Sequence, residues 1–150
     1  MGTISAGEGN SSYVQAGPGG VLSPIIWRIL SAVALLAMGG IHLFLVLDGV
    51  DGLLGVLFTL NAIGGLLLAI AMLVAPRRLL AIASVLSLLF IVGTLLALIL
   101  ALTVGLFGIT EQIDGQLVPT TLIVESIGIV VLAVTTALAF RMQRMRAAHS

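Results

Sequence analysis

Four long apolar runs, separated by short polar breaks, constrain this 150-residue chain more than any other feature. The runs cover about residues 24–47, 51–75, 79–107 and 119–140. Each is longer than the roughly 20 residues that an α-helix needs to cross the hydrocarbon core of a bilayer. Backbone N–H and C=O groups must be satisfied within the bilayer, so such runs form helices. The sequence therefore predicts an all-α fold, a four-helix transmembrane up-down bundle.

Composition excludes the other broad classes of protein. Hydrophobic residues make up 60% of the chain and charged residues 8%, whereas a soluble domain carries about 25% charged residues. The six basic residues are all Arg and are balanced by six acids, which excludes nucleic acid as a partner. The chain has no Cys, so neither a disulfide framework nor a thiolate metal site is available.

The two ends of the chain differ from the four spans. Residues 1–23 are rich in Gly, Ser and Asn and bury too little apolar surface to order themselves, so we expect a disordered tail. Residues 24–140 form the transmembrane domain, and residues 141–150 form a basic tail. In the tight turn between the first two spans, Gly49 can end one helix in the left-handed conformation, and Asp51 can cap the next.

Charge placement predicts the orientation of the spans. One set of helix ends carries the arginines, namely Arg28, Arg77, Arg78, Arg141, Arg144 and Arg146. The opposite ends carry the acids Asp48, Asp51, Glu111 and Asp114. By the positive-inside rule both termini are cytoplasmic and the acidic loops face outward. We expect a multi-pass protein of a prokaryotic cytoplasmic membrane, whose partner is the lipid bilayer and whose arginines also suit anionic lipid head groups.

Small residues predict where the helices pack against one another. Lipid supplies no hydrophobic drive between helices, so close approach at Gly and Ala must hold them together. Stripes with a four-residue spacing occur at Gly65 and Ala69, at Gly93, Ala97, Ala101 and Gly105, and at Ala133 and Ala137. We expect contacts within the bundle. The alternative is that one stripe docks a membrane-protein partner or a second copy in a homo-oligomer.

A faint internal repeat relates residues 61–77 to residues 125–141 at an offset of 64 positions. If the repeat is real, the bundle consists of two parallel helical-hairpin repeats about an axis along the membrane normal. Asn61 and Glu125 then occupy equivalent places and can both face the central axis. A chance match in a sequence of biased composition is the alternative.

A few side chains within the spans can do chemistry. Counting about 1.5 Å of rise per residue, His42, Asn61, Thr103 and Glu125 lie about 6 to 12 Å below the outer ends of their helices. Thr59 lies in the same layer, and Thr94 is a further hydroxyl within a span. An ionisable group in a span is costly, so we expect these side chains to point inward and to pair. One arrangement has Glu125 accepting a hydrogen bond from His42, as a neutral or as an ionised pair.

Three interpretations of this polar layer remain open. It can be structural, with buried groups that satisfy each other and set the register of the bundle. It can be a functional ionisable site, such as a proton relay or a head-group pocket for a quinone or lipid. It can also be a metal site, although His42 and Glu125 supply only two ligands where a catalytic zinc site uses three. We predict no cofactor and no metal, with quinone or metal as the alternatives.

Two resemblances to known families can be stated from short motifs. Gly40-Ile41-His42-Leu43, Leu57-Phe58-Thr59-Leu60-Asn61-Ala62 and Gly105-Leu106-Phe107-Gly108 before Glu125 resemble an uncharacterised family of small four-span membrane proteins of high-GC actinobacteria. The start Arg28 to Gly39-Gly40-Ile41-His42 is similar to the first helix of DoxX-type four-helix membrane proteins. That second resemblance implies a link to quinone-dependent redox chemistry.

These observations favour a non-enzymatic small integral membrane protein that acts as an accessory or stabilising component of a membrane assembly. The alternative is a membrane redox or proton-handling protein that uses His42 and Glu125. A third class is a transporter or channel subunit, which would need oligomerisation because four spans leave little room for a pore.

Overall fold

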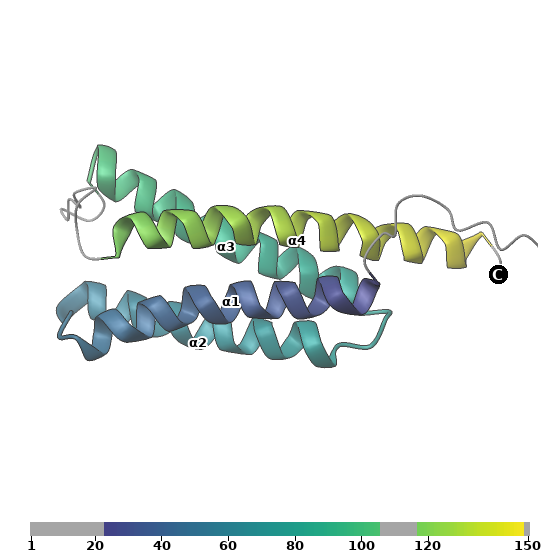
Figure 1. Ribbon diagram of the computed structural model, residues 1–150, viewed down its shortest axis with the longest axis horizontal. Coiled ribbons are helices and arrows are strands. Elements are labelled where there is room, and N and C mark those ends of the chain that lie inside the picture. The colour runs from purple at the N-terminus through teal and green to yellow at the C-terminus, as the bar shows by residue number, and fades with distance from the viewer. Residues whose placement is uncertain (1–22, 106–116, 149–150) are drawn as a thin grey trace, which may run out of the picture.

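The computed structural model describes residues 23–105 and 117–148 of the chain. Within them it has four helices, α1 (Pro24–Leu47), α2 (Gly52–Val74), α3 (Leu80–Thr103) and α4 (Val118–Ala147), shown in Figure 1. All four are long and apolar enough to cross a membrane. The chain is therefore a small, all-α, multi-pass integral membrane protein, as the sequence predicts.

Two helix boundaries differ from the predicted spans. α3 ends at Thr103, and Gly105 lies beyond it with a φ of 81°, so this glycine is not part of a helical stripe. α4 continues through Ala147, so the predicted basic tail is mostly helical. The added turns contain good helix formers and no Gly or Pro that would end the helix. The predicted tail before residue 23 and the loop acids Glu111 and Asp114 lie outside the described residues.

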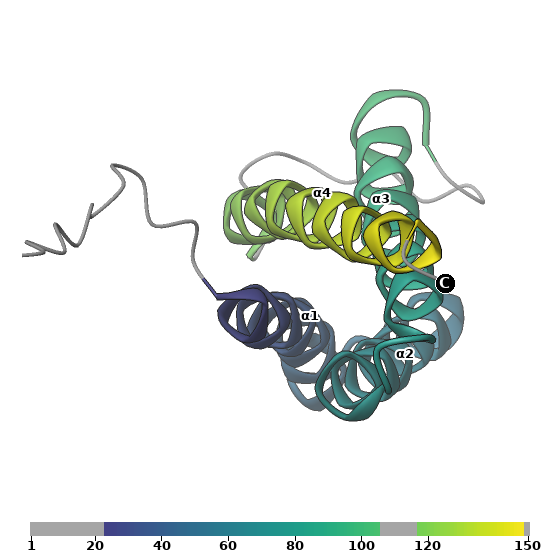
Figure 2. The ribbon, with the colours of Figure 1, turned by 90° about the vertical axis from the view of Figure 1, so that its right-hand side faces the viewer.

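The helices alternate in direction and lie around a ring, as the end-on view in Figure 2 shows. α1 packs against α2 and α4, and α3 packs against α4, whereas the contact between the consecutive helices α2 and α3 is much smaller. Figure 2 shows why, since α3 leans away from α2 along its length. We name the two ends of the bundle after their charges: the arginine end (Arg28, Arg77, Arg78, Arg141, Arg144) and the aspartate end (Asp48, Asp51).

Glycine brings the backbones of α1 and α2 together. A Cβ atom added at Gly65 would lie 2.9 Å from the Leu35 carbonyl oxygen, and one added at Gly39 would lie 3.3 Å from the Ala62 carbonyl oxygen. Ala69, one turn from Gly65, is buried as well. In the turn between these helices Gly49 has the expected left-handed φ of 103°. Asp51, by contrast, makes no side-chain capping bond.

The stripe on α3 packs differently from the stripe on α2. Gly93 is exposed, and a Cβ atom added there would meet nothing within 4 Å. Ala97 is half-buried, and Ala101 alone of the stripe is buried. Ala133 and Ala137 of α4 are also exposed. The prediction that these stripes hold the bundle together is therefore wrong for Gly93, Ala133 and Ala137, because α3 and α4 meet along other faces.

The predicted repeat has one counterpart in the packing of α3. Gly64 and Gly128 are matched residues of the repeat, and each lies beneath a bulky side chain of α3. Phe90 covers Gly64, and Ile91 covers Gly128, so closely that a Cβ atom at either glycine would clash. The repeat itself stays a prediction.

Arg28 ties α1 to the end of α2. Its guanidinium donates three hydrogen bonds to backbone carbonyls, to Met72 and Leu73 at 2.8 Å each and to Ala75 at 2.9 Å. The last four carbonyls of any helix lack partners within the helix, and a cation there also interacts favourably with the negative end of the helix dipole. A role in topology and lipid binding is what the sequence predicts for Arg28, but its side chain serves as a cap for α2.

Candidate functional site

Glu125 is the buried ionisable group of α4. The buried positions of this helix follow one seam with alternating spacings of three and four residues: Val118, Thr121, Glu125, Gly128, Leu132, Thr135 and Ala139. That spacing is typical of a helix with one face against its neighbours. Because Glu125 lies on the seam, its side chain is only 1% exposed.

Contacts along the seam place Glu125 opposite α3. Ile91 covers Gly128, and three residues away on each of these antiparallel helices Thr94 meets Glu125. The Thr94 hydroxyl faces the Glu125 carboxyl, but it donates its hydrogen bond to the Ile91 carbonyl at 2.9 Å. Neither carboxyl oxygen of Glu125 has a hydrogen-bond partner among the described residues. The carboxyl is thus both buried and unsatisfied.

His42, also buried, is satisfied within its own helix. It is 6% exposed, and its Nδ1–H donates to the Met38 carbonyl at 2.9 Å. The ring packs edge-on against Phe58 of α2, with centroids 5.0 Å apart and planes at 73°. With Nδ1 occupied, a neutral ring keeps its acceptor lone pair on Nε2. The expected hydrogen bond between His42 and Glu125 is not formed, because the imidazole reaches back along α1.

The other predicted members of the polar layer are more exposed. Asn61 is half-buried on α2. Thr103 is exposed and donates to the Ile99 carbonyl at 2.7 Å. Thr59 is exposed and donates to the Gly55 carbonyl at 2.7 Å. The expectation that Thr103 points inward is wrong, since it lies at the end of α3 that leans away from the bundle.

Metal ligands do not gather in the part of the chain that the structure describes. Residues 23–105 and 117–148 contain no group of three His, Cys, Asp or Glu side chains that could hold an ion. The two acids of the predicted outer loop, Glu111 and Asp114, fall outside those ranges. The arrangement therefore offers a single buried carboxyl, with Thr94 beside it, as its chemical group.

A hydroxyl cluster in the arginine half of the bundle is a feature that the sequence pattern did not reveal. Ser31 of α1 and Thr135 of α4 are both buried, and their hydroxyl oxygens lie 2.8 Å apart, so that one hydroxyl donates to the other. Backbone acceptors lie beside the pair, the Trp27 carbonyl at 2.9 Å from Ser31 Oγ and the Val131 carbonyl at 2.9 Å from Thr135 Oγ1. Three further neutral polar atoms on α1, α3 and α4 are buried and have no hydrogen-bond partner among the described residues: Trp27 Nε1, Ser87 Oγ and Thr136 Oγ1. Thr121, Glu125 and Thr135 lie four and ten residues apart, which places them on one face of a helix, and this is the signal that could have found the face.

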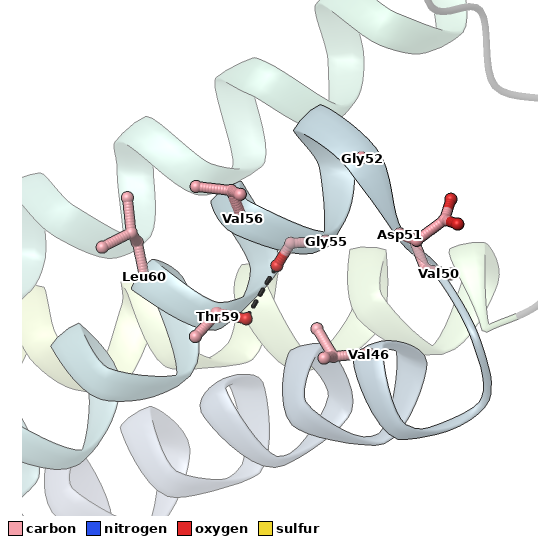
Figure 3. A pocket seen from close by; sticks show the side chains of 8 residues that line it. All are labelled: Val46, Val50, Asp51, Gly52, Gly55, Val56, Thr59 and Leu60. Atoms are coloured by element: carbon pink, nitrogen blue, oxygen red, sulfur yellow. Dashed lines mark hydrogen bonds between the residues drawn. The ribbon is translucent and has the colours of Figure 1, made fainter.

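A shallow groove lies at the aspartate end, between α1 and α2. It has a volume of about 370 Å³ and is lined by Val46, Val50, Asp51, Gly52, Gly55, Val56, Thr59 and Leu60. Figure 3 shows the Thr59 hydroxyl turned to the Gly55 carbonyl and the Asp51 carboxylate directed away from the other lining side chains. The groove is therefore apolar inside, and neither Glu125 nor His42 lines it.

Comparison of the chain with protein-family models, with curated proteins and with solved structures found no match. The resemblances to the actinobacterial family and to DoxX-type proteins therefore stay predictions. The arrangement of the residues themselves is what remains to indicate a function.

Proposed function

We propose that this small integral membrane protein handles protons, and that the carboxyl of Glu125 is the group that binds and releases them. The observation that carries the proposal is the burial of both carboxyl oxygens without a hydrogen-bond partner among the described residues. An isolated carboxylate is very costly in an apolar interior. Protonation of the carboxylate, or a hydrogen bond donated to it, reduces that cost. Glu125 is therefore suited to binding a proton.

A purely structural role accounts less well for Glu125. Polar groups that hold helices together do so through hydrogen bonds between helices. Ser31 and Thr135 make such a bond, whereas the Thr94 hydroxyl that faces the Glu125 carboxyl donates to the Ile91 carbonyl of its own helix. Even a neutral buried group without a partner costs about 1 to 3 kcal/mol. Ionisable residues within membrane spans are functional candidates by default.

Packing supports access from the aspartate end. On the arginine side of Glu125, Ile91 covers Gly128, and Leu132, the next residue of the seam, is fully buried as well. On the other side, α2 and α3 diverge, and the half-buried Asn61 lies on α2. His42, with Nε2 free to accept, is the second proton carrier in this proposal. Proton exchange then takes place from the aspartate end only.

Infrared difference spectroscopy of the protein in liposomes tests the proposal. A pH step on the aspartate side should change the C=O band of a protonated carboxyl, and Glu125→Gln should abolish that change. Thr103→Val is the matched control and should keep the native response, since the Thr103 hydroxyl is bonded within α3. If Glu125→Gln is poorly folded, Glu125→Asp and His42→Gln replace it. A carboxyl band that ignores pH, or one that persists without Glu125, would overturn the proposal.

Orientation is part of the same proposal: both termini cytoplasmic, in a prokaryotic cytoplasmic membrane. The support is that each described arginine lies at one end of the bundle. Because the chain has no Cys, single Cys substitutions can be labelled cleanly in intact cells. An impermeant maleimide should label Asp51→Cys at the aspartate end, where the side chain is exposed and makes no capping bond, and leave Ala148→Cys unlabelled until the cells are opened. The reverse pattern would contradict this orientation.

A second candidate function, an accessory component of a membrane assembly, is favoured by a different observation. Gly93, Ala133 and Ala137 lie on outer faces that no other described helix covers. Such positions allow close approach of another transmembrane helix. Native mass spectrometry after mild solubilisation should then detect a stable partner or second copy, lost in Gly93→Leu or Ala133→Leu. A monomer without partners would count against this role.

A further inference from the structure

Four arginines at the arginine end have no acidic partner among the described residues. Arg77, Arg78, Arg141 and Arg144 are all exposed. The acids among residues 23–105 and 117–148 are Asp48 and Asp51, at the opposite end, and the buried Glu125. Arg28 differs from these four, because its guanidinium already donates to three carbonyls of α2. Within the described parts of the chain, this end of the bundle therefore presents four uncompensated guanidinium groups.

Two separate segments bring these arginines into one surface. Arg77 and Arg78 lie in the turn between α2 and α3, and the Gln143 side chain of α4 donates to the Arg78 carbonyl at 3.2 Å. That bond places the last turns of α4 beside the turn. Arg141 and Arg144 lie three residues apart on α4, one on each side of Gln143 in sequence, and so share a face of the helix.

The position of this surface relative to the bilayer follows from the length of α4. A helix of 30 residues is about 45 Å long, whereas the hydrocarbon core is about 30 Å thick. Figure 1 shows the end of α4 projecting beyond the other helices. Phe140 and Met145, which are exposed apolar side chains, flank the arginines on α4. Apolar and cationic side chains together are typical of the head-group region.

We infer that this surface binds the phosphate-bearing head group of an anionic phospholipid, held between the turn at Arg77 and Arg78 and the α4 face at Arg141 and Arg144. Guanidinium groups bind phosphate oxygens in a bidentate manner and with charge complementarity. Phe140 and Met145 favour a lipid over free phosphate, because they offer contact to acyl chains. Each arginine contributes about fivefold to the affinity, the equivalent of about 1 kcal/mol. This site is independent of Glu125.

Native mass spectrometry of the full chain from nanodiscs that mix phosphatidylglycerol with phosphatidylcholine tests the inference. We expect phosphatidylglycerol to be enriched on the protein, and the enrichment to fall by about 20-fold or more in Arg141→Gln/Arg144→Gln. Arg141→Lys/Arg144→Lys keeps the charge and loses the bidentate guanidinium geometry. Its enrichment of phosphatidylglycerol should therefore lie between that of the native chain and that of the Gln variant. Raising the salt concentration should weaken retention of phosphatidylglycerol by the native chain.

Two controls make the result decisive. Melting curves should show that Arg141→Gln/Arg144→Gln is folded. If the changes on α4 disturb that helix, Arg77→Gln/Arg78→Gln in the other segment takes their place and should give the same loss of phosphatidylglycerol. Equal retention of phosphatidylglycerol by the native chain and both Gln variants would overturn the inference. So would inorganic phosphate displacing the lipid at equal concentration, because the site would then recognise free phosphate rather than a lipid.

Discussion

The two buried polar regions of this bundle differ in the kind of group that each leaves without a hydrogen bond. In the arginine half, the Ser31 and Thr135 hydroxyls bond to each other between α1 and α4, with backbone carbonyls of their own helices as further acceptors. In the aspartate half, Glu125 lies on the same seam of α4 and finds no partner among the described residues. The first region uses small neutral groups, and the second leaves an ionisable group unpaired. Unpaired atoms also occur in the arginine half, at Trp27 Nε1, Ser87 Oγ and Thr136 Oγ1. What separates the two regions is therefore that the unpaired group of the aspartate half is ionisable.

The largest effect that we expect comes from a satisfied group, Arg28. Arg28→Gln removes most of the donors that cap α2, and hydrogen bonds from charged groups contribute about 1.5 to 3 kcal/mol each. We expect the free energy of unfolding in detergent to fall by about 3 kcal/mol. Arg77→Gln, which removes an exposed arginine at the same end, should change it by less than about 0.5 kcal/mol. Equal effects of the two changes would mean that the cap contributes nothing.

Glu125→Leu should change stability in the opposite direction. Replacing an unpaired buried acid by an apolar side chain of similar size removes a desolvation cost, so we expect the unfolding free energy to rise by about 1 to 3 kcal/mol. Proton binding should be lost in the same variant. A fall in stability on this change would indicate that Glu125 has a hydrogen-bond partner, and the contrast between the two regions would disappear.

The sequence predicts the number of spans, their approximate limits and the separation of charges, because these depend on hydropathy and charge alone. It predicts less well which face of a helix turns inward. In a membrane protein, apolar side chains cover the lipid-facing surface as well as the core, so the stripe at Gly93 and Ala97 looks like a packing face although Gly93 is exposed. The burial of Glu125 could be expected from its cost in lipid. The hydrogen bond of His42 within its own helix and the capping of α2 by Arg28 could not be expected from the sequence. Both depend on which acceptor a long side chain reaches.

A double-mutant cycle measures the bond between Ser31 and Thr135. Ser31→Ala and Thr135→Val each remove one hydroxyl from the buried pair. Interhelical hydrogen bonds in membranes have coupling energies of about 0.6 kcal/mol on average and about 1.7 kcal/mol at most. We expect a coupling in that range from unfolding measurements on the two single variants and the double variant. Additive effects would show that the two hydroxyls do not stabilise each other.

Thr103→Val should have the smallest effect of the series. The Thr103 side chain is exposed and its hydroxyl donates to the Ile99 carbonyl of its own helix. That carbonyl lies in the last turn of α3, so the hydroxyl adds no contact between helices. Replacement by Val, which has the same shape, should therefore change the unfolding free energy by less than about 0.5 kcal/mol. The infrared response of Glu125 should also remain native. A loss comparable to that of Thr135→Val would place Thr103 inside the bundle and would extend the polar region around Glu125 to the end of α3.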